Sequence, residues 1–205
     1  MSAIELGRLL RASTTGCVLG CKITRVEAPS FGSMVRIPLG NDLFTYGLIY
    51  DMHIDDDGLV RQLVTAPSLR PEVIQDNREN RNLPVEISIL FIGYEKEGDI
   101  FHLLPPRPPL TLDMIYGCST AELSRFTSAG RFGYFRHILR QVDLPVPELL
   151  AAHLQQAHAA QAASGNPHWL RDATRELITL LRDDYSVLNA VLGAIADLNP
   201  SETRS

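Results

Sequence analysis

The chain has 205 residues, of which 45% are hydrophobic and 21% charged, and its formal net charge is −5 at pH 7. This composition is ordinary for a water-soluble globular protein, and the apolar fraction suffices for a substantial core. The negative charge argues against a protein that binds nucleic acid over its whole surface, although a local basic patch is compatible with it. The sequence has no apolar run near the ~20 residues that a membrane-spanning helix needs.

The cysteine pattern favours reduced thiols and a cytoplasmic location. There are three cysteines, and none belongs to a Cys-x-x-Cys pair. Cys17 and Cys21 lie four positions apart in a β-like run, about 13 Å from each other at ~3.3 Å per residue, which is too far for a disulfide. Residues 1–14 carry two arginines within their apolar part, which is not the pattern of a secretory signal.

The first half of the chain reads as strands joined by tight turns. Residues 3–12 predict a short amphipathic helix, and residues 16–26 predict the first β-strand. The stretch 31–64 then holds three β-type runs. Gly40-Asn41-Asp42 separates the first run from the second, and Asp57-Gly58 separates the second from the third; both are hairpin signals because such turns need positive φ.

A polar connection and a second hairpin follow. Residues 67–82 predict a long surface connection with a short helix, and residues 83–94 are the most β-rich run of the chain. Glu97-Gly98-Asp99 turns this run into a further strand at 100–104. About six strands without helical crossovers predict a small six-stranded, mainly antiparallel β-barrel.

The proline run at 105–109 and the helical pattern after it divide the chain. Four prolines in five positions predict a rigid exit from the barrel, with a ligand for a polyproline-binding domain as the alternative. Beyond it the pattern becomes helical, and Ser119 to Glu122 forms a capping box. We therefore expect a mixed β + α protein, with a barrel at 14–117 and a C-terminal α-helical domain or cap at 118–205.

Further helix starts are predicted at Pro147 and at Asn166-Pro167, because proline is tolerated in the first helical turn. Trp169 heads the apolar stripe of the second of these helices, and a last helix starts near Tyr185.

The segment 125–140 is the strongest candidate for binding, since it holds four arginines, four aromatic residues and no acidic residue. In one interpretation its aromatic rings enter the core and its arginines face water or the acidic barrel. In a second it is a protein-binding hot spot, and in a third its arginines bind phosphates while its rings stack on bases. The candidate partner-binding residues are Arg125, Arg131, Phe132, Tyr134, Arg136 and Arg140.

Three other patterns are better explained by structure than by chemistry. A calcium loop around Asp57-Gly58 would place His53 and Val64 where carboxylates are needed. His153 and His158 are five positions apart, so they diverge by about 140° on a helix and make a poor zinc pair. Residues 117–121 resemble a nucleophile elbow without its last glycine, and the capping box accounts for their serine.

Four short motifs, in order along the chain, resemble the HAS-barrel. They are Gly16-Cys17-Val18, Phe31-Gly32-x-x-Val35, Tyr46-Gly47-Leu48-Ile49-Tyr50-Asp51 and Arg107-Pro108-Pro109. The HAS-barrel is the small β-barrel at the N-terminus of HerA-type DNA translocases and is related to the barrel of ATP synthase subunits. The resemblance covers about residues 14–117. It implies a barrel that promotes ring assembly and docks partner proteins, with a proline segment leading into the motor.

The motor of that family has no counterpart here. A phosphate-binding loop needs the pattern G-x-x-x-x-G-K-S/T, which is absent, and the sequence has only the lysines Lys22 and Lys96. We therefore expect a non-catalytic assembly or adaptor protein without cofactor or metal, which binds a DNA-processing ATPase or nuclease; a homo-oligomer is a further expectation. The alternative is a nucleic-acid-binding accessory protein that uses residues 125–140. An enzyme is the least supported hypothesis.

Overall fold

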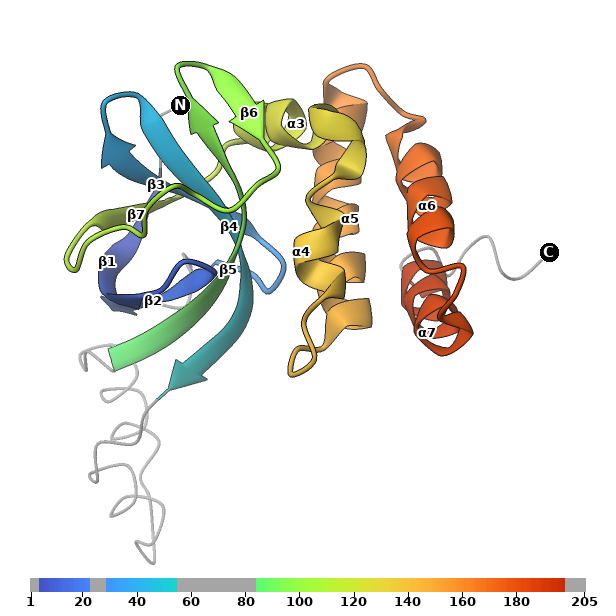
Figure 1. Cartoon of the computed structure of the whole chain (residues 1–205), viewed down its shortest axis with the longest axis horizontal. Coiled ribbons are helices and arrows are strands. Elements are labelled where there is room, and N and C mark those ends of the chain that lie inside the picture. The colour runs from blue at the N-terminus through green and yellow to red at the C-terminus, as the bar shows by residue number, and fades with distance from the viewer. Residues whose placement is uncertain (1–3, 23–28, 55–83, 198–205) are drawn as a thin grey trace, which may run out of the picture.

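The computed structural model describes residues 4–22, 29–54 and 84–197 (Figure 1). All described strands belong to one antiparallel sheet, in the order β2-β1-β7-β3-β4-β5-β6. Their bounds are β1 (Ile4–Ala12), β2 (Gly16–Lys22), β3 (Met34–Gly40), β4 (Leu43–Ile54), β5 (Pro84–Lys96), β6 (Asp99–Phe101) and β7 (Met114–Gly117).

An additional pairing of β2 with β5 closes six of these strands into a barrel, and β6 adds to β5 as a seventh strand. The predicted six-stranded antiparallel barrel is confirmed, and a closed ring leaves few free strand edges. The predicted strand at 59–65 and the connection at 67–82 lie outside the described residues.

The helix predicted at 3–12 is wrong, because these residues form β1. This strand pairs with β2 on one side and with β7 on the other. Its register shifts between Glu5 and Gly7 and again between Leu9 and Arg11. Such irregularities interrupt the two-residue alternation of a strand, so the apolar spacing imitates that of a helix.

Two predicted turns are present and lie side by side. Asn41 and Asp42 have positive φ in the turn between β3 and β4, as do Glu97 and Gly98 between β5 and β6. These values suit the tight turns that match the twist of a hairpin. The Glu97 amide donates to the Asp42 carbonyl over 3.1 Å, which joins the two turns at one end of the barrel.

The helical half forms two further layers beside the barrel (Figure 1). Its helices are α3 (Thr120–Ser128), α4 (Phe135–Leu139), α5 (Val146–Ala163), α6 (Trp169–Leu180) and α7 (Tyr185–Ala196), with a short helical turn η1 (Gly130–Phe132) before α4. The predicted capping box of α3 is confirmed, since Ser119 Oγ accepts the Glu122 amide and Glu122 Oε2 accepts the Ser119 amide. Helix α6 starts only at Trp169, because the Asn166 amide donates to the Gln161 carbonyl and so belongs to the end of α5.

The structure has two hydrophobic cores that share the strands β3, β4 and β5. One fills the barrel interior and contains residues such as Leu19, Ile37 and Phe91. The other lies between the outer wall of the barrel and the helices, where Tyr46 and Leu48 of β4 meet side chains of α3 to α7. The helical half is therefore fixed to the barrel by burial of apolar surface, the main favourable contribution to folding.

Candidate functional site

Arg125, the first of the candidate binding residues, ties α3 to the barrel. Its guanidinium makes two hydrogen bonds to the carboxylate of Glu95 on β5, over 2.9 and 2.6 Å, and the Tyr46 hydroxyl donates to the same carboxylate over 2.6 Å. Burial alone would raise the pKa of Glu95, but the hydrogen bonds from Arg125 and Tyr46 outweigh it and hold that pKa below its ordinary value. Arg125 thus has a structural partner already.

Most aromatic rings of the segment 125–140 are in the core. Phe126, Tyr134 and Phe135 are fully buried. Phe132 is half-buried, and its ring centroid lies 5.5 Å from those of both Phe135 and Trp169. The side chain of Tyr134 is therefore closed to a partner, and stacking of these buried rings on bases has no geometric support.

Between α3 and α4 the backbone makes a left-handed turn that points Arg131 into solvent. Gly130, Arg131 and Phe132 all have positive φ, and the Gly133 amide donates to the Gly130 carbonyl over 3.0 Å. A Cβ on Gly130 would lie 2.7 Å from Nδ1 of His102, so this position has room only for glycine. The turn separates Arg131, which is exposed, from Phe132, which packs inward.

The remaining arginines of the segment lie on α4 and its end. Arg136 donates to the carbonyl oxygen of His102, which His137 Nε2 also contacts over 3.1 Å, and Arg140 is exposed. Among the described residues, no carboxylate forms an ion pair with Arg131, Arg136 or Arg140. Arg131 and Arg140 are therefore the part of the predicted site that stays available for a partner, whereas Arg136 is half-buried and held by the His102 carbonyl.

Two buried histidines enclose Tyr134 behind this surface. The ring centroids of His102 and His153 lie 5.0 and 5.5 Å from that of Tyr134, and His153 Nε2 lies 3.1 Å from the Tyr134 hydroxyl. Burial lowers the pKa of His102 and lowers that of His153 to about 4. Both imidazoles are consequently neutral at pH 7 and serve the core.

The residues that resemble a nucleophile elbow are unsuited to attack. Ser119 Oγ donates to Glu122 Oε2 over 2.8 Å within the capping box. Burial raises the pKa of the Cys118 thiol well above its ordinary value, so the reactive thiolate is disfavoured. In the described ranges, His, Cys, Asp and Glu side chains form no group of three that could hold a metal ion, and no helix is long and apolar enough to cross a membrane.

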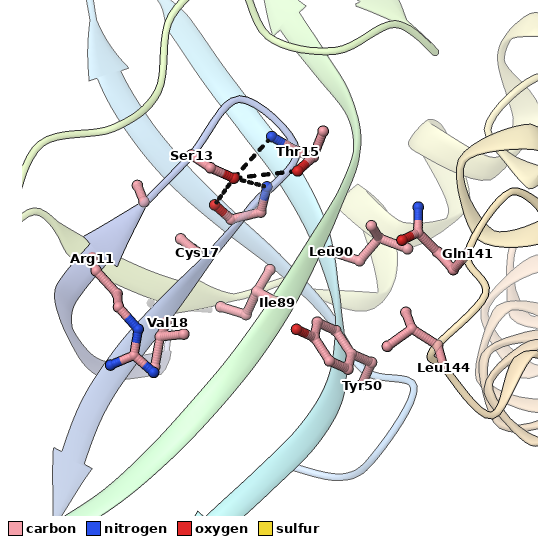
Figure 2. A pocket seen from close by; sticks show the side chains of 12 residues that line it. Arg11, Ser13, Thr15, Cys17, Val18, Tyr50, Ile89, Leu90, Gln141 and Leu144 are labelled. Atoms are coloured by element: carbon pink, nitrogen blue, oxygen red, sulfur yellow. Dashed lines mark hydrogen bonds between the residues drawn. The ribbon is translucent and has the colours of Figure 1, made fainter.

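A cavity of about 320 Å³ lies where the turn between β1 and β2 faces the loop before α5 (Figure 2). Tyr50 lies between Ile89 of the barrel and Leu144 of that loop. Two of its polar side chains, Ser13 and Arg11, have partners within the fold. Ser13 Oγ accepts the amides of Thr15 and Gly16, each over 3.2 Å, and the Arg11 guanidinium pairs with Glu86 over 2.9 Å. The cavity therefore supports the β1–β2 turn and offers a ligand little unpaired polar surface.

The connection from β6 to β7 crosses the outside of the barrel and displays several apolar side chains (Figure 1). Four exposed leucines lie along it, directly after the exposed Phe101 that ends β6. We call these five residues the leucine rim: Phe101, Leu103, Leu104, Leu110 and Leu112. Pro105 and Pro109 are buried, and Arg107 donates to the Leu39 carbonyl over 2.6 Å. The segment 105–109 is therefore not the predicted exit from the barrel, because β7 follows it and pairs with β1 and β3. It is a connection between two strands of the sheet, and it displays apolar side chains.

Next to the leucine rim is a hollow of about 300 Å³, which we call the proline hollow. It is lined by Pro38, Leu39, Gly40, Arg107, Pro108, Pro109, Leu110 and Asp113. Sequence reasoning treated only residues 105–109 as notable and missed Leu110 and Leu112. The available signal was a Leu-Thr-Leu sequence that follows the prolines and belongs to neither a helical nor a strand pattern.

A scan against models of known protein families finds no match, and a search of curated proteins finds no significant similarity. The resemblance to the HAS-barrel therefore rests on the sequence motifs and stays a prediction.

Proposed function

We propose that this chain is a non-catalytic assembly or adaptor protein whose barrel and helical cap bind a larger partner protein. The leucine rim is the observation that carries the proposal. Large apolar side chains grouped on one exposed segment mark interaction sites, because their burial in an interface is favourable. The resemblance to the HAS-barrel points to an ATPase or nuclease of DNA processing as the partner.

The rim also has the rigidity that a docking surface needs. Buried Pro105 and Pro109 fix the backbone of the segment, and proline reduces the freedom that is lost on binding. Two residues of catalytic type have structural roles: Ser119 caps α3, and Glu95 joins the barrel to Arg125. Both observations support binding over chemistry.

Co-purification from the native cell tests this function. The tagged wild-type chain is compared with the double variant Leu103→Ser/Leu110→Ser, and bound proteins are identified by mass spectrometry. Because both leucines are exposed, the variant keeps its fold, and we expect it to lose an ATPase or nuclease that the wild type retains. A partner retained equally by both proteins would exclude the rim as its docking surface.

A nucleic-acid-binding accessory protein is the second candidate, favoured by Arg131 and Arg140, which are exposed and have no carboxylate partner among the described residues. Fluorescence anisotropy with a labelled single-stranded oligonucleotide at low and physiological salt would test it. Binding that falls in Arg131→Ala/Arg140→Ala but not in Arg171→Ala would favour this candidate, because Arg171 already pairs with Asp172. Under the adaptor proposal we expect no binding at physiological salt.

A further inference from the structure

Residues 110–113 form a tight turn, the leucine turn, in which Leu112 takes a position that normally requires glycine. The Asp113 amide donates to the Leu110 carbonyl over 3.1 Å, which closes the turn. Leu112 is the third of the four residues, and its φ is 73°. A leucine is disfavoured in this left-handed region because its Cβ approaches the following carbonyl oxygen, so turns of this kind select glycine or asparagine.

The backbone of the turn is held in place by hydrogen bonds to β1. The Leu112 amide donates to the Leu9 carbonyl over 2.8 Å, and the Leu9 amide donates to the Asp113 carbonyl over 2.9 Å. Arg8 Nη1 adds a bond to the Leu112 carbonyl over 3.1 Å. All three bonds use main-chain atoms of the turn, so a glycine at position 112 would keep them and remove the strain.

The side chain of Leu112 gives the fold little in return, since it is 63% exposed. Leu110 in the same turn is 73% exposed and lines the proline hollow. On β1, Leu10 is also exposed, directly after the residue that anchors the turn. Strain that persists without burial is typical of positions at binding sites.

Two arginines and one carboxylate border these leucines. Arg8 and Arg107 donate to the carbonyls of Leu112 and Leu39, and within the described ranges neither forms an ion pair with a carboxylate. Asp113 is the one carboxylate that lines the proline hollow, and its Oδ2 accepts the Leu110 amide over 2.7 Å. In a chain whose net charge is −5, two arginines without a carboxylate partner among the described residues thus lie beside the exposed leucines.

We propose that Leu112 is the anchor of a docking surface for an acidic amphipathic segment of a protein partner, an inference that rests on the adaptor function above. In this mode, an apolar side chain of the partner segment occupies the proline hollow beside Leu110. The backbone and the neighbouring side chains of the partner segment bury Leu112. Carboxylates of the segment pair with Arg8 and Arg107. Charge complementarity of this kind fixes the orientation of a partner and speeds its association.

The test uses the full chain and a phage-displayed library of random 12-residue peptides. We expect enriched peptides to combine Asp or Glu with at least one large apolar residue. The affinity of a synthetic enriched peptide should fall about tenfold or more in Leu112→Gly. It should also fall about tenfold or more in the separate double variant Arg8→Ala/Arg107→Ala. It should weaken with rising salt and stay unchanged in Leu180→Ala, which alters an exposed leucine on α6.

A stability measurement separates a binding role from a structural one. The unfolding temperature of Leu112→Gly should equal that of the wild type or exceed it by up to about 3 °C, because relief of strain offsets the added freedom of the unfolded chain. A clear decrease would overturn the proposal, as would an absence of enrichment, enrichment of basic or neutral peptides, or an affinity that Leu112→Gly leaves unchanged. If these tests fail while the native partner still depends on Leu103 and Leu110, the adaptor function stands and this docking mode falls.

Discussion

At the scale of single residues, the arginines of the segment 125–140 have two different roles. Arg125 pairs with a carboxylate that is only 7% exposed, whereas Arg131 points into solvent from a left-handed turn. The Arg125 side chain is itself 46% exposed, but its removal leaves the buried Glu95 carboxylate uncompensated, whereas removal of a cation without a buried partner has little effect on folding. Structural and available cations can therefore be distinguished by stability measurements.

We predict that Arg125→Ala lowers the free energy of unfolding by about 2 kcal/mol, because Glu95 loses its two charge-assisted hydrogen bonds. Denaturant unfolding at pH 7 measures the change, and Arg131→Ala, with an expected change below about 0.5 kcal/mol, is the matched control. The folded pKa of Glu95 is lowered, so its contribution is present above its unfolded pKa and is lost as the pH falls through the folded value. A difference between wild type and Arg125→Ala that did not shrink in acid would contradict the assignment.

The buried His153 gives a second prediction, which concerns a base, whereas Glu95 is an acid. Burial lowers its folded pKa to about 4 from an ordinary value of about 6.5, so below about pH 6.5 the unfolded chain takes up a proton that the folded chain does not. We expect the free energy of unfolding to decrease as the pH falls from about 6.5 to about 4. In His153→Gln this part of the profile should be flatter, and equal slopes in both proteins would rule out this histidine as the cause.

At the scale of the elements, regular periodicity was a reliable guide and local irregularity was not. The hairpin turns at 40–42 and 97–99 and the α3 capping box were predictable, because each depends on a few neighbouring residues. Strand β1 was not, because two register shifts disturb its alternation and its stability comes from pairing with β2 and β7. Tertiary pairing overrides local preference at such positions.

The candidate site shows the same limit. The composition of residues 125–140 pointed to this segment. It could not show which arginine has a carboxylate partner, because Arg125 meets Glu95 of β5, which lies 30 positions earlier in the chain. The leucine turn was missed because the exposure of a leucine is decided by the packing of distant strands. Composition can suggest a surface, but burial decides which side chains belong to it.

Trp169, the first residue of α6, links this helix to α3. Trp169 is 3% exposed, and its indole Nε1 donates to the Thr127 carbonyl over 3.2 Å. We predict that Trp169→Ala lowers the free energy of unfolding by about 3–5 kcal/mol, since it leaves a large cavity and an unpaired carbonyl. The exposed Tyr185→Ala on α7 is the control, and a similar loss in both variants would contradict the packing described here.

At the scale of the whole molecule, the barrel and the helices depend on one another. The outer wall of β3 to β5 contributes Met34, Tyr46, Leu48, Leu90 and Ile92 to the core shared with the helices. A barrel without helices would expose all five side chains, and an exposed group of large apolar side chains favours association. The helical half thus acts as a permanent cover of the barrel wall, while the leucine rim remains free on the segment 101–112.

This arrangement predicts the behaviour of a fragment that ends at residue 117. We expect it to self-associate, because its outer wall is uncovered, and light scattering across a concentration series measures this directly. The full chain under the same conditions is the control. A fragment that stayed monomeric and folded at all concentrations would show that the barrel does not need the helical cover.

Photo-cross-linking in the native cell tests the adaptor role most directly. A photoreactive amino acid is placed at Leu110 on the leucine rim, and in a second chain at Thr179, which is exposed on α6. We predict that position 110 forms a discrete cross-link to one protein, identified by mass spectrometry, and that position 179 does not. No protein cross-link from position 110, or the same products from both positions, would contradict the claim that the rim docks a partner.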